Sequence, residues 1–184
     1  IRKAANRAKD LIGQLLTFSR ETETNQQPVL LFPIIKETIK LLRASLPSTI
    51  EIHRDIETGQ EKIMADPAQV HQIIMNLCTN AVQAMDEKGG RIDVSLKAVV
   101  VGAEESQSIH DLSPGKHLLL TIRDNGRGMD KDTLDNLFEP FFTTKETGKG
   151  TGLGLATVYG IVQQNNGFIN VYSELGKGTT FKIY

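Results

Sequence analysis

Residues 148–155 read GKGTGLGL, a stretch in which glycine alternates with other residues and after which a helical pattern begins at about Leu153. Such a stretch leaves backbone N–H groups free beside a helix N-terminus, where the helix dipole favours a phosphate. It is neither a Walker loop nor a Gly-x-Gly-x-x-Gly fingerprint, because neither spacing occurs. A flexible linker is the alternative, but the stretch lacks serine and a helix follows at once. We therefore predict a phosphate-binding turn here.

The chain around this stretch has 184 residues, 39% hydrophobic and 23% charged, with a formal net charge of −1. That length corresponds to one domain with a short appendage. A single cysteine excludes an internal disulfide and favours a reducing compartment. The longest apolar run is too short to span a bilayer, and no signal-peptide pattern opens the chain. The balanced charge argues against nucleic acid as a partner.

A second glycine cluster, DNGRGM at residues 124–129, directly follows a predicted strand. Its glycines allow a turn with positive φ or a close approach of the backbone to a ligand. The carboxylate of Asp124, at the strand end, can accept a hydrogen bond from an exocyclic amine, which would select adenine over guanine. An ordinary turn is the alternative, since Asn-Gly is also a turn signal. These residues alone leave both interpretations open.

A predicted helix at 67–85, opened by Asp66 as N-cap and Pro67 as first residue, contains no Lys, Arg, Asp or Glu. Its apolar face consists of Val70, Ile73, Ile74, Leu77 and Ala81. An uncharged polar stripe on the other face consists of Gln69, Gln72, Asn76, Asn80 and Gln83. Amide oxygens are suitable ligands for a hard cation such as Mg²⁺. Hydrogen-bonded surface amides are the alternative.

Three phenylalanines in residues 138–142 (FEPFF) precede the glycine stretch, and 143–145 (TTK) join the two. Phenylalanines can anchor the base of a mobile segment by burial. Lys145 and Lys149 would then lie on that segment, within reach of phosphate oxygens. A packed loop with solvated lysines is the alternative. A last cluster, GKGTT at 176–180, predicts a turn between strands and alone means little.

Helices and strands alternate in mixed order along the chain. Helical patterns cover residues 33–46, 67–85, 130–137 and 153–164. Strand patterns cover residues 50–56, 91–101, 116–123, 169–172 and 179–184, and a polar loop is expected at 102–115. This order predicts an α/β (α+β) two-layer sandwich with one mixed sheet and helices on one face.

The N-terminal residues 1–24 have the apolar spacing of a bundle helix, with a seam of Ile1, Ala4, Ala8, Leu11, Leu15 and Phe18. One helix cannot bury such a seam alone, so we expect partners upstream or in a second subunit. Residues 25–27 are the expected linker and 28–184 the main domain. Because the chain starts without methionine and stops inside a predicted strand, we expect a fragment of a longer protein.

Taken in order, the amide-rich helix, the three glycine clusters and the phenylalanine segment resemble the N, G1, F, G2 and G3 boxes of sensor histidine kinases. These kinases belong to the GHKL (Bergerat-fold) ATPase superfamily. The resemblance covers about residues 28–184, and residues 1–24 look like the second helix of the kinase's dimerisation hairpin. It implies a Bergerat ATP-binding fold, ATP and Mg²⁺ as cofactors, and protein-histidine kinase activity in two-component signal transduction.

The resemblance also implies roles for single residues. Asn80 coordinates Mg²⁺ with Asn76 beside it, and Asp124 binds the adenine amino group. The implied catalytic residues are Asn76, Asn80 and Lys145. The implied ATP-binding residues are Asn76, Asn80, Asp124, Gly126, Gly128, Met129, Lys145, Gly150, Thr151, Gly152, Leu153, Gly154 and Thr179. Some relatives carry a basic residue three positions after the second asparagine, where this chain has Gln83, so we expect no phosphate contact from that position.

The family transfers the γ-phosphoryl group to a histidine that is followed by Glu or Asp and, five residues on, by Pro. Residues 110–114 (HDLSP) imitate this motif, but the proline comes one residue early. The segment also lies in an expected loop, whereas the acceptor belongs on a helix. We therefore reject His110 and expect the acceptor upstream of Ile1.

Three functions stay open. The first is the catalytic domain of a histidine autokinase. The second is an ATP-driven conformational ATPase like gyrase, MutL or Hsp90, which carry a glutamate where this chain has Asn76. The third is a regulatory nucleotide-binding module or an anti-sigma-type serine kinase. Asn76 and the intact boxes favour the first.

The kinase resemblance implies specific partners. They are the dimerisation (phosphoacceptor) domain of its own kinase and the receiver domain of a response regulator. It also implies a homodimer in the full-length protein and a cytoplasmic location for this domain, whether or not the full-length protein is anchored in a membrane.

Overall fold

The computed structural model describes residues 25–57, 59–85, 89–108, 112–145 and 150–184. The predicted bundle helix at 1–24, His110 and Lys149 lie outside these residues. The helices and strands, in chain order, are β1 Gln27–Leu30, α2 Leu31–Ser45, β2 Ile50–Ile56, β3 Lys62–Ala65, α3 Pro67–Ala84, β4 Gly90–Val101, α4 Ala103–Ser108, β5 Gly115–Asp124, α5 Lys131–Asp135, α6 Gly154–Gln164, β6 Ile169–Glu174 and β7 Gly178–Ile183. Over the described part of the chain, none of the helices is long and apolar enough to cross a membrane.

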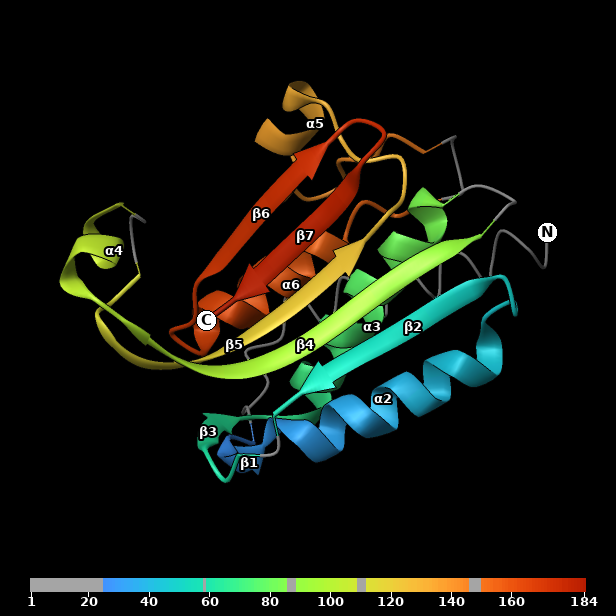
Figure 1. Ribbon diagram of the computed structural model, residues 1–184. Coiled ribbons are helices and arrows are strands. Elements are labelled where there is room, and N and C mark those ends of the chain that lie inside the picture. The colour runs from blue at the N-terminus through green and yellow to red at the C-terminus, as the bar shows by residue number, and fades with distance from the viewer. Residues whose placement is uncertain (1–24, 58, 86–88, 109–111, 146–149) are drawn as a thin grey trace.

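A five-stranded sheet in the order β2-β4-β5-β7-β6 forms one layer. β2 pairs with β4 in parallel, whereas the pairs β4–β5, β5–β7 and β7–β6 are antiparallel. In Figure 1 the helices α3 and α6 lie behind this sheet and α2 runs alongside and below β2, while β1 pairs with β3 in a separate two-stranded sheet. The predicted two-layer sandwich, with a mixed sheet and helices on one face, is therefore confirmed.

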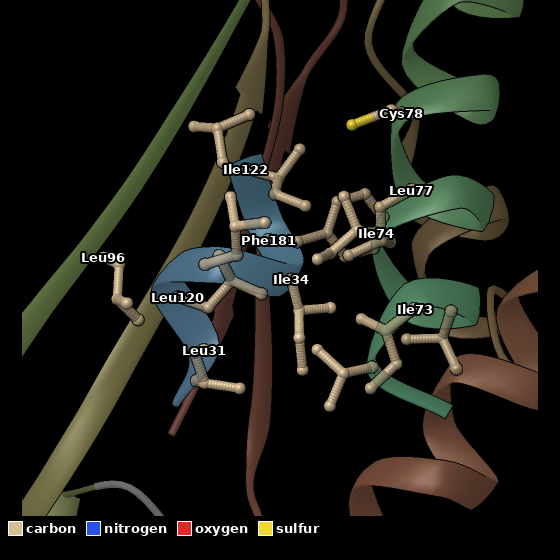
Figure 2. Packing of buried hydrophobic residues seen from close by; sticks show 14 of the residues in the cluster. Leu31, Ile34, Ile73, Ile74, Leu77, Cys78, Leu96, Leu120, Ile122 and Phe181 are labelled. Carbon is tan, nitrogen blue, oxygen red and sulfur yellow. The ribbon is translucent and has the colours of Figure 1, made fainter. Parts of the chain in front are cut away.

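The core fills the space between the sheet and the helices α2, α3 and α6. Leu120 and Ile122 are two residues apart on β5, so both side chains point to the same face of the sheet, the one that the helices cover. On α3, Ile74 and Leu77 are 0% and 1% exposed and pack against them; Figure 2 shows the two sides of this core. Burying one such aliphatic side chain contributes about 1.5–3 kcal/mol to stability. This packing fixes which face of α3 remains for polar residues.

Helix α2 begins at Leu31, two residues before the start that its pattern predicts. Pro33 lies in the first turn, where the missing N–H has no intrahelical partner and the fixed φ of proline is compatible with a helix. The sequence pattern predicts that the helix begins at Pro33. In the structure the N-cap is Leu30, whose backbone is extended, and the helix begins one residue later.

Two expectations about the connections differ from the structure. Gln27, in the predicted linker, is the first residue of β1 and pairs with Ala65 of β3. The predicted polar loop 102–115 instead contains helix α4, and Gly115 already belongs to β5. Ser106 of α4 donates its hydroxyl to the carbonyl of Leu112 at 2.6 Å, which closes this segment against the β4–β5 hairpin.

Candidate functional site

A cavity of about 980 Å³ lies between α3, the end of β5, the start of α6 and residues 142–145. The structure brings to it most of the residues that the resemblance implies for ATP: Asn76, Asn80, Asp124, Gly128, Met129, Lys145, Gly150, Thr151, Gly152, Gly154 and Thr179. Gly126 and Leu153 do not line it. Gly126 is buried next to Ala84, and Leu153, 4% exposed, is the N-cap of α6.

Asp124 comes two residues after Ile122, on the same face of β5, so its carboxylate faces the helix layer at the end of this strand. It is only 5% exposed. Its Oδ1 accepts the backbone N–H of Gly126 at 2.8 Å and that of Thr179 at 3.3 Å. Desolvation raises the pKa of Asp124, although these two backbone hydrogen bonds oppose the increase. Since both donors use Oδ1, Oδ2 is, among the described contacts, the oxygen that can accept from a ligand.

The turn after Asp124 is fixed by two backbone hydrogen bonds of Arg127, one to the end of α3 and one to the turn between β6 and β7. Arg127 donates its N–H to the carbonyl of Ala84 at 2.9 Å, and its own carbonyl accepts the N–H of Gly176 at 2.7 Å. Gly128 has φ +67°, and a Cβ there would overlap the backbone of Glu174. Only glycine fits this position, because the φ is left-handed and the neighbouring chain is in contact.

A serine outside the predicted set connects this turn to β7. Ser173 on β6 accepts the N–H of Met129 at 2.9 Å, and its hydroxyl lies 3.0 Å from the hydroxyl of Thr179. Thr179 thus donates its backbone N–H to Asp124 and forms a hydrogen bond with Ser173 through its hydroxyl. These contacts connect the turn after β5 with β6 and β7 at one end of the cavity.

Gly152 lies at the base of the segment 142–152, here called the lid, whose described residues 142–145 and 150–152 line the other end of the cavity. It has φ +67°, its carbonyl accepts the N–H of Phe141 at 3.0 Å, and a Cβ would overlap the Phe141 backbone. Phe141 itself has φ 70°, which is uncommon for a bulky residue. The chain thus closes a loop between Phe141 and Gly152, directly before α6.

Asn76 links α3 to the start of α6, because its Nδ2 donates to the carbonyl of Gly154 at 3.1 Å. One turn further along α3, Asn80 Oδ1 accepts the ammonium group of Lys145 at 3.4 Å. The same ammonium donates to Gln83 Oε1. Burial lowers the pKa of Lys145, and the positive charge of Arg127 lowers it further.

A cation at this end of the cavity would depend on amide oxygens. Over the described residues, no three His, Cys, Asp or Glu side chains gather into a metal-binding group. Asn80 Oδ1, however, faces the cavity and already accepts a cationic group, and hard cations prefer such oxygens. Asn76 has its nitrogen engaged, which leaves its oxygen for a ligand. These amides therefore fit Mg²⁺.

Sequence reasoning assigned no role to Arg127, Ser173 or Gln83, although all three bear on this site. Arg127 lines the cavity. It stands between Gly126 and Gly128 in the cluster at 124–129, and a cationic side chain at that place could have indicated an anionic ligand. Gln83 was set aside because it is not basic. Ser173 gives no signal in the sequence, because its importance depends on the pairing of β6 with β7.

Residues 65–184 match the family model described as histidine kinase-, DNA gyrase B- and HSP90-like ATPase. Sensor kinase CckA of Brucella abortus is 40% identical over the whole of this chain, which covers 19% of that relative. Sensor histidine kinase ZraS of Escherichia coli K12 is 34% identical over 99% of this chain, which covers 36% of that relative. The chain thus spans only about a fifth to a third of these curated relatives.

Solved structures share the fold. The mycobacterial sensor histidine kinase MprB superposes with a TM-score of 0.67 at 24% identity, over 86% of this chain and 95% of that one. Full-length ShkA in complex with AMPPNP gives a TM-score of 0.77 at 24% identity, over 99% of this chain and 36% of that one. The chain belongs to the family of histidine kinase-, DNA gyrase B- and HSP90-like ATPases. Within it, the chain is a GHKL ATP-binding domain of the histidine kinase type.

Proposed function

We propose that this chain is the catalytic domain of a sensor histidine kinase, which transfers the γ-phosphoryl group of Mg–ATP to a histidine on a separate dimerisation helix. The imidazole nitrogen would form a bond to the γ-phosphorus while the bond to the β–γ bridging oxygen breaks. ADP would leave with that electron pair. Phosphoryl transfer of this kind needs positioning and charge neutralisation more than a strong base.

The observation that carries this proposal is how the carboxylates that line the cavity are engaged. Among its described lining residues they are Asp124 and Asp130. Asp124 is bound by two backbone N–H groups, and Asp130 caps α5 by accepting the N–H of Thr133 at 2.8 Å. Asn76 occupies the position at which the hydrolytic relatives named above carry a glutamate, and an amide cannot take a proton from water. This favours transfer to a protein nucleophile over hydrolysis.

In this proposal the residues divide by the part of ATP that they contact. Asp124, Met129 and Thr179, with the turn at Gly126 and Gly128, hold the adenine. Asn80, with Asn76 beside it, holds Mg²⁺, which when bound neutralises charge on the β- and γ-phosphate oxygens. The cavity's described lid residues toward the phosphates are Lys145, Gly150, Thr151 and Gly152, together with Gly154 at the start of α6. Leu153, which is buried, would support them as the N-cap of α6. The N-terminus of α6 adds uncovered N–H groups, since Leu153 makes no side-chain cap.

The proposed partners follow from the relatives. CckA and ZraS are named as sensor kinases, and a fold neighbour, ThkA, was solved in complex with a response regulator protein, TrrA. We infer that this domain acts on the dimerisation domain of its own kinase for relay to a receiver aspartate. In the same proposal the whole protein is a homodimer, this domain is cytoplasmic, and residues 1–24 are part of the dimerisation hairpin.

The test is phosphoryl transfer from γ-labelled ATP with Mg²⁺ to a separately produced dimerisation domain of the same kinase. We expect label on a histidine of that domain, in a form stable to base and labile to acid, and none when Asn80→Ala replaces the wild-type chain. Release of labelled phosphate without labelled protein would instead support a gyrase- or Hsp90-like ATPase. ATP binding without either product would support a regulatory module.

A further inference from the structure

The ammonium group of Lys145 sits between two side-chain amides of α3. Its Nζ donates to Asn80 Oδ1 at 3.4 Å and also to Gln83 Oε1. Asn80 and Gln83 are three residues apart, so they lie side by side on the helix surface. Lys145 comes from the lid, 62 residues further along the chain than Gln83. This contact therefore connects the lid to α3 across the cavity.

The two acceptors hold the ammonium without cancelling its charge. Both are neutral amide oxygens, and no ion pair between Lys145 and a carboxylate occurs among the described residues. Among the described residues, the ammonium group of Lys145 therefore reaches the cavity without a carboxylate as its counter-ion. An anion that enters the cavity would supply the missing charge.

The position of this cation depends on Gln83 more than on Asn80. Asn80 is the proposed Mg²⁺ ligand, and its single oxygen cannot hold both cations at full strength. Gln83 lines the same cavity, and in the proposed site its Oε1 does not bind Mg²⁺. Gln83 can therefore keep Lys145 beside the phosphates after Asn80 has bound the metal.

We propose that Gln83 is a positioning residue that places the lid cation Lys145 beside the phosphates of ATP, so that the lid supplies the positive charge that α3 itself lacks. The inference rests on the proposed function. It assigns a role to a position from which the sequence predicted no phosphate contact. Position 83 must be neutral for this role, because a carboxylate there would pair with Lys145 and repel the phosphates.

The variant Gln83→Glu tests this directly, since it keeps the shape of the side chain and changes only its charge. It should hold Lys145 at least as firmly, as an ion pair, so thermal unfolding should not be weakened. Its affinity for ATP, measured by calorimetry, should nevertheless fall about tenfold, which is the loss of one charge-assisted contact. Its affinity for adenosine should not change, because adenosine has no phosphate. A purely structural role would predict no loss for ATP.

Gln72→Glu is the matched control, because it adds the same charge to the same helix outside the cavity lining. We expect it to bind ATP as the wild type does. Lys145→Gln should lose about tenfold in ATP affinity, and the exchange variant Gln83→Lys with Lys145→Gln should recover most of it by restoring a cation at this place.

Three results would overturn the inference: wild-type ATP affinity in Gln83→Glu, equal losses in Gln83→Glu and Gln72→Glu, or an exchange variant as weak as Lys145→Gln. Its failure remains distinct from failure of the proposed function. If Asp124→Asn weakens ATP while Gln83→Glu does not, only the role of Gln83 is wrong. If the wild type binds neither ATP nor adenosine, the proposed function itself is wrong.

Discussion

Asp124 is a carboxylate held almost out of solvent by backbone N–H groups rather than by a cationic side chain. Its Oδ1 accepts from Gly126 and Thr179, so the orientation of the group is set by the backbones of the turn after β5 and of β7. A buried carboxylate with a free oxygen costs stability unless a donor arrives. The exocyclic amine of adenine is such a donor, whereas guanine has an oxygen at the corresponding position.

The variant Asp124→Asn should lose ATP affinity without unfolding. Its Oδ1 can still accept both N–H groups, which turns Nδ2 toward the ligand and sets a donor against the adenine amine. We expect a loss of about 10- to 100-fold in calorimetry, equivalent to roughly 1.5–3 kcal/mol. Unchanged affinity would contradict the role of Asp124.

The pH dependence of stability provides a second readout for the same variant. The pKa of Asp124 is raised in the folded state, so the folded protein binds this proton more tightly than the unfolded chain. Wild-type stability should therefore gain from this group as the pH falls through the raised pKa toward about 3.9, the ordinary value of the unfolded chain. Asp124→Asn lacks this contribution and should be no less stable than the wild type at pH 7. A chemical denaturation series against pH measures the difference.

The base of the lid is an element whose geometry depends on two residues in the left-handed region. Gly152 and Phe141 both have positive φ and are joined by a backbone hydrogen bond of 3.0 Å. The strain at Phe141 is local, since its side chain is 58% exposed and contributes little to the core. Gly152 therefore determines how the chain leaves the lid and enters α6.

Gly152→Ala should disturb this base. The new Cβ would strain the left-handed backbone, by roughly 1–2 kcal/mol, and would also overlap the Phe141 backbone. We expect a lower free energy of unfolding and weaker ATP binding. The matched control is Gly160→Ala within α6, where the added Cβ would have no atom within 4 Å other than its chain neighbours and the backbone of its own helix. It should stabilise α6 by about 0.5–1 kcal/mol. Equal effects of the two variants would show that the lid base is not special.

Elements with a clear period were predictable, and short ones were not. β2 occupies the predicted residues 50–56, since Ile50, Ile52 and Ile56 lie on one face and are buried or half-buried there. The apolar face of α3 was predicted correctly for the same reason, and the buried set adds only Cys78. β1 and β3 have four residues each and depend on pairing with each other, so neither stretch carries a signal alone. α4 has six residues, fewer than a period needs.

At the scale of the whole molecule, one cavity collects residues from elements that lie far apart in the sequence: α3, β5, α5, α6 and β7. Asn76 and Asn80 come from α3, Asp124 from β5, Thr179 from β7 and Lys145 from the lid. The sequence predicted that these residues share a site, because their motifs resemble a family in a fixed order. It could not predict that Lys145 meets Gln83, since that contact depends on the path of a lid between two fixed ends. In the proposed function, the end held by the backbone around Asp124 and Thr179 binds the base, and the end beside Lys145 and Gly152 faces the phosphates.

The central claim is that this cavity binds ATP, selects adenine through Asp124 and uses Mg²⁺ at the amide end. The most direct test is titration calorimetry of the unaltered chain with ATP and with GTP, each with and without Mg²⁺. We expect ATP to bind at least about tenfold more tightly than GTP, the cost of leaving the buried acceptor unpaired, and Mg²⁺ to strengthen the binding of ATP. Equal affinities for ATP and GTP, or no binding of either, would contradict the claim.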